Sequence, residues 1–551
     1  MTTETTYPSV TDSASVQNPK QIEDPSFYQI ALPLEPKAAI SLNGHQTYKE
    51  KLVRLLTSDL DFRNEDTGFA SHDLHSFPAK YPPQLPATFI NGLTDSGDLV
   101  LDPMIGSGTT IVEAVRLQRK AIGFDIDPLA RLITLVKSTF VDPDLVLEAG
   151  QEVIKAAQHT LATQEDALTK KLDQRWDKPT QRFVDYWFAP QVQLELLSLI
   201  VEIDRIPDDK IRSFLHLVLS ACIITKTGGV SMAFDLAHTR PHRAKVVYAQ
   251  SGRLIVGEDL ADSDNARVQF LTKNLKSPIS EFARKLKQNV SSIQDLNATW
   301  ERPTIHEGNA QQLPLADSTV DLIVTSPPYA SNAIDYMRAH KFSLVWLGHE
   351  INDLSVTRSG YIGGESITSF DFEALPAYTT GVIQGVAAKD AKKGQVLRRY
   401  YSEMKRVLGE MYRVLRPGKA AIVVVASSIM RGRDTETDRC LAEIGEAIGF
   451  EIPAIGVRHI DRNKRMMPAG KKIDLDSQIQ QRMHEEYVIG FYKPTRGEVR
   501  GKENFEIPKM RWGKTTAGET PISYSAIPPF GPFLAVNASG KNESRTPCLV
   551  N

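Results

Sequence analysis

The ten residues LDPMIGSGTT, residues 101–110, decide the fold of this 551-residue chain. The short apolar run Asp98 to Asp102 leads into this stretch, and a helical pattern of apolar residues follows from Thr109 to Leu117. A second short apolar run, Lys120 to Asp125, comes next and ends at an acid. Strand, glycine turn, helix and strand in this order make a βαβ unit. The sequence therefore predicts an α/β protein with a mostly parallel sheet.

The glycines of this turn indicate a bound ligand. A glycine-rich turn between a strand and a helix lets a ligand approach the backbone closely. Asp125 ends the next strand, where a carboxylate reaches ribose hydroxyls in dinucleotide-binding folds. The turn lacks the GxGxxG pattern of a pyrophosphate cradle. The residues therefore favour a nucleoside with an uncharged linker, such as S-adenosylmethionine, although Gly-Ser-Gly alone would also suit a plain β-turn.

A second candidate site follows another buried strand. Val320 to Thr325 is a continuous apolar run, and Ser326-Pro327-Pro328-Tyr329 comes directly after it. The two prolines fix the backbone and remove two amide donors, which leaves a serine hydroxyl and a rigid carbonyl as acceptors for an exocyclic amine. Tyr329 offers an aromatic face on which a base can stack. Because open α/β sheets bind ligands at the carboxyl ends of strands, we favour a binding site over an ordinary Pro-Pro turn.

Composition excludes several classes of protein. With 41% hydrophobic and 24% charged residues and a net charge of -2, the chain is unlike collagen, coiled coils and fully disordered proteins. No apolar run approaches the ~18 residues of a membrane helix, and no apolar secretory segment stands near the N-terminus. The three cysteines, Cys222, Cys440 and Cys548, show no CxxC spacing, which indicates a reducing compartment without structural zinc. We expect a cytoplasmic protein with no metal and no membrane partner.

Composition and periodicity also divide the chain into five segments. Residues 1–45 have low hydrophobicity and no period, which predicts a disordered arm. Residues 46–144 and 301–495 carry the α/β signal, and the mainly helical residues 145–300 are predicted to form a subdomain inserted between them. Residues 496–551 are predicted to be a loop-rich tail. Three helices are predicted, over Gln191–Asp204, after a cap at Asp208 or Asp209, and over Tyr400–Leu415 with Arg416-Pro417-Gly418 closing it. Strands are predicted over Lys419–Ala426 and Glu486–Tyr492.

The two candidate sites together resemble an amino-methyltransferase of the class I (Rossmann-like) fold, in the family that methylates exocyclic amines of DNA bases. The likeness covers about 70–140 and 300–495, and it covers the helical insertion more weakly. The glycine turn precedes the SPPY tetrapeptide, which resembles the γ-type order of motifs. Further segments that resemble the family, in the same order, are His75 to Pro83 (HSFPAKYPP), Gly308-Asn309-Ala310, Ala333 to Trp346 (AIDYMRAHKFSLVW), Arg413 to Gly418 (RVLRPG) and Glu486-Tyr487-Val488.

The resemblance implies S-adenosylmethionine as the cofactor. Phe77 to Lys80 would flank its methionine end, the glycine turn would bind it, and Asp125 would hold its ribose. The family usually has Asp where this chain has Asn309, whose side-chain oxygen can still accept from the adenine amine but adds no charge. The residues implied to bind the cofactor are Phe77, Pro78, Ala79, Lys80, Asp102, Pro103, Gly106, Ser107, Gly108, Thr109, Asp125, Asn309 and Ala310.

The resemblance also implies the reaction, which is methyl transfer to the exocyclic amine of a base in double-stranded DNA. Tyr329 would stack on the flipped base, while Ser326 and the carbonyl of Pro327 would accept from its amine. SPPY resembles the N4-cytosine enzymes, and serine is a weaker acceptor than aspartate, so we favour N4 of cytosine and keep N6 of adenine as the alternative. The residues implied to be catalytic are Ser326, Pro327, Pro328 and Tyr329.

Other interpretations compete with this one. The same pocket would serve RNA or protein amine methylation, and a DNA-binding module with a decayed pocket is a non-enzymatic alternative, against which intact Ser326 and Tyr329 argue. Methylation at C5 of cytosine is excluded, because it needs a cysteine nucleophile where this chain has Ser326. Restriction-system proteins are candidate partners, although no nuclease or helicase motif identifies one.

Two regions are candidates for contact with DNA. The helical insertion and residues 345–395 are predicted to take part in target recognition. Arg458 begins a basic stretch with Arg462, Lys464 and Arg465, which would either hold DNA phosphates or form a solvated surface loop.

Overall fold

The structure is a computed structural model that describes residues 46–236, 241–261, 263–294, 296, 298–330, 335–460 and 485–498. The predicted arm and nearly all of the predicted tail lie outside these ranges. The chain divides into two units, residues 1–500 and 501–551, and all described residues belong to the first. None of the helices in the described ranges is long and apolar enough to cross a membrane.

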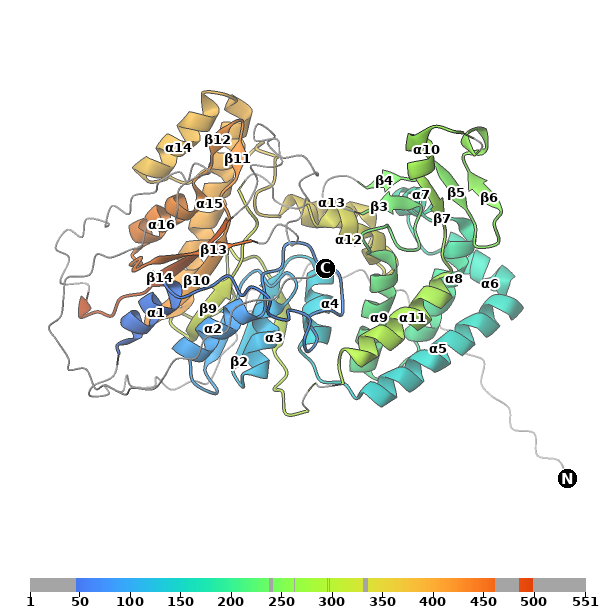
Figure 1. The fold of residues 1–551 in the computed structure, drawn as a ribbon, viewed down its shortest axis with the longest axis horizontal. Helices are drawn as coiled ribbons and strands as arrows, with labels where there is room; N and C mark the ends of the chain where they lie inside the picture. Colours follow the sequence, from blue (N-terminus) through green and yellow to red (C-terminus); the bar gives the residue numbers. More distant parts are fainter. Residues whose placement is uncertain are drawn as a thin grey trace, which may run out of the picture. The chain divides into compact units, whose positions relative to one another are not determined.

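A mostly parallel sheet forms the centre of the first unit. Neighbouring strands from β8 to β10 are parallel, whereas β14 is antiparallel to both of its neighbours. This arrangement confirms the predicted α/β fold of class I methyltransferase type. Among the described residues, seven strands form this sheet (Figure 1), in the order β13 (Ile455–His459), β14 (Glu485–Tyr492), β10 (Leu415–Val425), β9 (Val320–Thr325), β1 (Leu99–Asp102), β2 (Lys120–Asp125) and β8 (Thr304–Glu307).

Helices cover both faces of this sheet. Successive side chains of a strand point to opposite faces, so a continuous apolar run makes both faces apolar. Val100 and Ile422 face one apolar core, and the adjacent Leu101 and Val423 face another. All four side chains are fully buried, as expected for strands that read as continuous apolar runs. The first core is completed by α1 (Tyr48–Leu56), α2 (Gln84–Leu93) and α3 (Thr109–Arg116), and the second by α14 (Ala377–Ala387), α15 (Ala391–Val414) and α16 (Thr437–Ile448).

A third apolar core lies among the helices of residues 145–300. It also takes in α4 (Pro128–Lys137) before this segment and α12 (Met337–Leu344) after it, so its packing joins the segment to both parts of the α/β core. The helix predicted to be capped by Asp208 or Asp209 is present, and the Asp208 side chain is the cap. The helices of this segment are α5 (Pro143–Thr163), α6 (Glu165–Asp173), α7 (Lys178–Trp187), α8 (Pro190–Ile203), α9 (Asp209–Ile223) and α11 (Pro278–Ser291).

The same segment also contains short strands, which the mainly helical prediction did not include. One small sheet pairs two strands and a second pairs three. Each strand has two or three residues, too few for an alternating pattern to appear in the sequence. The elements are β3 (Ala233–Asp235), β4 (His242–Arg243), β5 (Val246–Tyr248), β6 (Leu254–Val256), η2 (Glu258–Leu260), α10 (Ala266–Phe270) and β7 (Thr272–Asn274).

Two predicted element boundaries within residues 301–495 are wrong. The helix α15 begins at Ala391 and not at Tyr400, because the Asp390 side chain caps it there. Arg416-Pro417-Gly418 does not separate helix from strand but lies within β10, whose register with β9 shifts at this point. A bulge can accommodate proline, which has no amide for the strand ladder. This part also contains α13 (Ile351–Ser359) and a hairpin of β11 (Ile429–Met430) with β12 (Arg433–Asp434).

The packing of Trp346 yields a stability prediction. Its ring centroid lies 4.9 Å from that of Trp176 and 5.3 Å from that of Phe188, and the side chain is fully buried. We expect Trp346→Ala to lower the free energy of unfolding by about 3–5 kcal/mol, as measured by urea denaturation. The indole nitrogen has no hydrogen-bond partner in the described part of the chain, so Trp346→Phe should cost clearly less. Equal losses in the two variants would contradict this account.

Candidate functional site

The carboxyl ends of four neighbouring parallel strands, β8, β2, β1 and β9, meet at one edge of the sheet, where a cavity opens. Open α/β sheets bind their ligands at this edge. The glycine turn after β1, Asp125 on β2, Asn309 after β8 and Ser326 after β9 all line it. The sheet topology thus brings together motifs that lie far apart in the sequence.

Most of the predicted site residues line this cavity. Pro78, Gly108, Pro327 and Tyr329 do not, although each is next in sequence to a residue that does. The predicted residues that line it are Phe77, Ala79, Lys80, Asp102, Pro103, Gly106, Ser107, Thr109, Asp125, Asn309, Ala310, Ser326 and Pro328.

The turn after β1 requires its glycines. Gly106 and Gly108 have φ angles of 47° and 78°, in the left-handed region that favours glycine. A Cβ atom on Gly108 would lie 2.7 Å from Oγ1 of Thr134 on α4. Backbone conformation and the close approach of α4 therefore both exclude a larger residue at Gly108, even before a ligand is considered.

Two carboxylates flank the turn, the buried Asp102 and the half-buried Asp125. The amides of Gly106 and Asp127 donate to the two oxygens of Asp125, at 3.0 Å and 2.9 Å. Burial, and then the charge of Asp127, raise the pKa of Asp125 to about 6. Asp102 accepts from the Met104 amide at 3.1 Å, and burial raises the pKa of Asp102 to about 7. Because each carboxylate oxygen has a second lone pair, Asp125 can still accept from a ligand hydroxyl.

A third carboxylate, Asp127, lines the cavity and was not predicted. Its Oδ1 caps α4, and its Oδ2 accepts from the Tyr361 hydroxyl at 2.5 Å and lies 2.6 Å from His340 Nδ1. Burial would raise the pKa of Asp127, but the charge of His340 and these hydrogen bonds lower it to about 2. The pair Asp127-Pro128 is a helix-start signal that could have identified Asp127, whereas no local pattern points to Tyr361.

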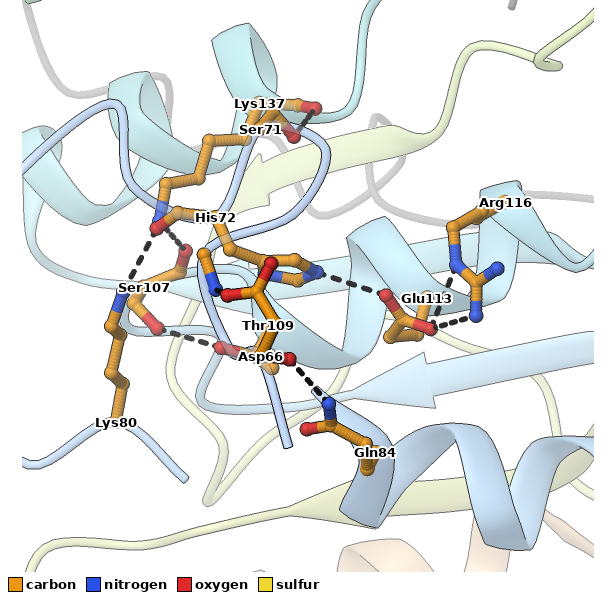
Figure 2. Close-up of polar contacts among 11 residues, drawn as sticks. Asp66, Ser71, His72, Lys80, Gln84, Ser107, Thr109, Glu113, Arg116 and Lys137 are labelled. Carbon is orange, nitrogen blue, oxygen red and sulfur yellow. Dashed lines mark hydrogen bonds and ion pairs between the residues drawn. The ribbon is translucent and has the colours of Figure 1, made fainter. Parts of the chain in front are cut away.

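Figure 2 shows the polar contacts behind the glycine turn. Lys80 Nζ donates to the His72 carbonyl at 2.9 Å, and Lys137 Nζ donates to the Ser107 carbonyl at 3.1 Å. Lys137 is fully buried, and burial together with the charge of Lys80 lowers the pKa of Lys137 to about 7. His72 Nε2 lies 2.9 Å from Glu113 Oε1 on α3. These contacts hold the segment around Lys80 against α3, and the glycine turn against α4.

The SPPY tetrapeptide turns part of its surface to the cavity. Ser326 and Pro328 line the cavity, whereas Pro327 is buried. Tyr329 is half-buried, and its hydroxyl donates to Oε1 of Glu486 on β14 at 3.0 Å. The side-chain hydroxyl that this motif presents to the cavity is therefore that of Ser326.

The structure corrects the interpretation of Arg458 as a phosphate contact. Arg458 is 7% exposed and forms an ion pair with Glu486. A buried, paired guanidinium cannot reach a DNA backbone, so this hypothesis is wrong for Arg458. Arg462, Lys464 and Arg465 lie outside the described residues.

Asn309 is exposed at the cavity, and its side-chain oxygen accepts from the Gln311 amide at 3.0 Å. That oxygen keeps one lone pair for a ligand amine. Within the described ranges, no group of three or more His, Cys, Asp or Glu residues could hold a metal ion.

The chain is similar in sequence to known methyltransferases. A family model for N6/N4 methyltransferases, described as DNA methylase, matches residues 27–134. The chain is 23% identical over 403 residues to Type II methyltransferase M.MvaI of Kocuria varians, which covers 70% of this chain and 83% of that protein. It is 22% identical over 407 residues to Type II methyltransferase M.BsoBI of Geobacillus stearothermophilus, and this match covers 64% of this chain and 73% of that protein. A stretch of 55 residues is 44% identical to Type II methyltransferase M.PvuII of Proteus hauseri, and this match covers 10% of this chain and 16% of that protein.

The raised pKa of Asp102 predicts a pH-dependent stability. The unfolded chain releases this proton near the ordinary pKa of 3.8, whereas the folded chain holds it up to about 7. The stability contributed by this group is therefore present at low pH and is lost as the pH rises from about 4 to about 7. Asp102→Asn keeps an acceptor but cannot titrate. We expect its free energy of unfolding to rise relative to wild type across this range, by something of the order of a few kcal/mol.

Urea unfolding of both proteins at intervals between about pH 4 and pH 8 measures this difference. Comparing the two proteins at each pH removes the contribution of all other titrating groups. A difference that stays constant with pH would show that Asp102 is ionised in the folded protein throughout.

Proposed function

We propose that this chain, a member of the N4-cytosine/N6-adenine family of amino-methyltransferases, is a site-specific DNA methyltransferase that transfers a methyl group from S-adenosylmethionine to N4 of cytosine. The observation that carries the proposal is the cavity shared by the glycine turn, Asp125 and Ser326. The DNA methylase family and the Type II methyltransferases among the relatives support DNA as the substrate.

The residues of the cavity suit S-adenosylmethionine. This cofactor carries positive charge on its sulfonium and ammonium groups, and Asp102, Asp125 and Asp127 bring carboxylates to the cavity. We assign the ribose hydroxyls to Asp125, the methionine end to Phe77 to Lys80 and the adenine to Asn309. When bound, the cofactor supplies an electrophilic methyl group.

The acceptor base would be held by the SPPY tetrapeptide. A base must leave the DNA stack to enter a cavity, which costs a few kcal/mol. Stacking on Tyr329 offsets part of this cost. Hydrogen bonds from the amine to Ser326 Oγ and the Pro327 carbonyl would orient the nitrogen lone pair, so placement and electrostatics supply most of the catalysis.

The choice of cytosine depends on Ser326. A neutral hydroxyl is a weaker acceptor than the carboxylate of an aspartate, and the SPPY tetrapeptide resembles the N4-cytosine enzymes. N6 of adenine is the alternative acceptor for the same amine chemistry.

Nucleoside mass spectrometry tests the reaction. DNA from a methylation-free host that expresses this chain should contain N4-methylcytosine. Tyr329→Ala removes the stacking face, which contributes ~1–3 kcal/mol per base, so we expect a roughly 5- to 150-fold lower rate of methylation. N6-methyladenine would keep the enzyme class and overturn the choice of base. Neither modified base, in protein that binds S-adenosylmethionine, would redirect the search to RNA or protein substrates.

The pKa of Asp125 predicts how cofactor affinity depends on pH. Because the folded-state pKa is about 6, Asp125 becomes ionised as the pH rises from about 5 to about 7. An ionised carboxylate accepts more strongly and attracts the cationic cofactor, so the dissociation constant should fall several-fold over this range. Asp125→Asn should bind more weakly and with a shallower pH dependence. Calorimetric titration measures both, and equal slopes for the two proteins would exclude Asp125 as the titrating group.

A further inference from the structure

The hydroxyl of Tyr329 is held from across the sheet. Tyr329 follows β9, whereas its partner Glu486 lies on β14, with β10 between the two strands. The hydroxyl donates to Glu486 Oε1 at 3.0 Å, and the ring packs against the apolar core on the α15 and α16 side of the sheet. Burial, and then the charge of Glu486, raise the pKa of Tyr329 well above its ordinary value, so the hydroxyl stays a donor at neutral pH.

Glu486 is itself held by Arg458. The two residues face each other in the register of β13 with β14, and Arg458 Nη1 donates to Glu486 Oε2. Both are buried, with 7% and 9% of their surface exposed. An apolar pair of similar volume is often as stable as a buried ion pair, so fold stability alone does not explain this one. The geometry offers a use for it, because Arg458 occupies one carboxylate oxygen and leaves the other for Tyr329.

A stacking ring needs a fixed plane, and the prolines do not supply it. Pro327 and Pro328 fix the backbone before Tyr329, but the torsion between Cβ and the ring has a broad, two-fold preference. The hydroxyl oxygen lies on the axis of this torsion, so its hydrogen bond to Glu486 fixes where the far end of the ring lies. Because a phenolic O–H prefers the plane of its ring, the position of the Glu486 acceptor also favours one ring plane.

We propose that Glu486, supported by Arg458, is a positioning residue that holds the ring of Tyr329 in the orientation a flipped target base requires. Glu486 acts through Tyr329 and does not touch the base. This inference rests on the proposed function, because it assigns the orientation of Tyr329 to base stacking.

The test replaces the ion pair without leaving a buried charge. The variant Arg458→Met/Glu486→Leu places an apolar pair of similar volume there, so it should fold with a thermal midpoint close to that of wild type, yet it removes the carboxylate that accepts from Tyr329. We expect its kcat for methyl transfer to plasmid DNA to fall roughly tenfold, with the dissociation constant of S-adenosylmethionine unchanged. Glu486→Gln retains an acceptor oxygen and should keep more of the activity.

A double-mutant cycle tests whether the effect passes through the hydroxyl. Tyr329→Phe removes the hydroxyl and keeps the ring, and it should lower kcat about as much as the apolar pair does. Combining the two should lower kcat no further, because both remove the same hydrogen bond. The matched control is Glu498→Gln. Glu498 accepts from the hydroxyl of Tyr492 at 3.1 Å at the opposite end of β14, and its replacement should leave kcat unchanged.

The outcomes separate the inference from the function on which it rests. Wild-type kcat in the apolar-pair variant, or multiplicative effects in the combined variant, would overturn the role of Glu486 while DNA methylation by the wild type still stood. If the wild type binds S-adenosylmethionine but transfers no methyl group to DNA, both proposals fall. If the apolar-pair variant does not fold, Tyr329→Phe alone decides, since a wild-type kcat in that variant contradicts the inference.

Discussion

The hydrogen bond from the Gly106 amide to Asp125 is the contact on which the site depends. It joins the turn after β1 to the end of β2, so that two neighbouring strands present one surface to the cavity. Because the strands are parallel, the surface continues to β8 on one side and to β9 on the other. The left-handed glycines allow the turn to fold back far enough for this contact. A larger residue at Gly108 would push against α4 and open the turn.

The three carboxylates around this turn differ in pKa because their surroundings differ. Asp127 has a histidine and a tyrosine hydroxyl as donors, and its pKa falls to about 2. Asp102 is buried and Asp125 is half-buried, both accept from backbone amides, and burial raises their pKa values to about 7 and about 6. For Asp102 and Asp125 the effect of burial on the pKa exceeds that of the hydrogen bonds, and for Asp125 it also exceeds that of the nearby charge of Arg131. The cavity therefore holds one permanent negative charge and two that respond to the solution or to a positively charged ligand.

Local patterns predicted the centre of this molecule well. The strands β1, β2 and β9 agree with the predicted runs to within one residue, because each is an apolar run bounded by polar residues, and the glycine turn was recognised from its own sequence. The partners of Asp127 and of Tyr329 could not be predicted in the same way. His340 and Tyr361 reach Asp127 only through the tertiary fold, and the register of β13 with β14 decides that Arg458 faces Glu486. A slip of one residue in that register would turn these side chains to opposite faces.

The long segment between β2 and β8 affects how the chain assembles during synthesis. β1 and β2 leave the ribosome together, but their neighbours β9 and β8 follow only after residues 145–300 have been made. Until then the β1–β2 pair has two open edges, which invite association with other chains. The core of the helices in this segment includes α4, which directly follows β2. The order of synthesis therefore leaves both edges of the β1–β2 pair without their partner strands until the whole segment has been made.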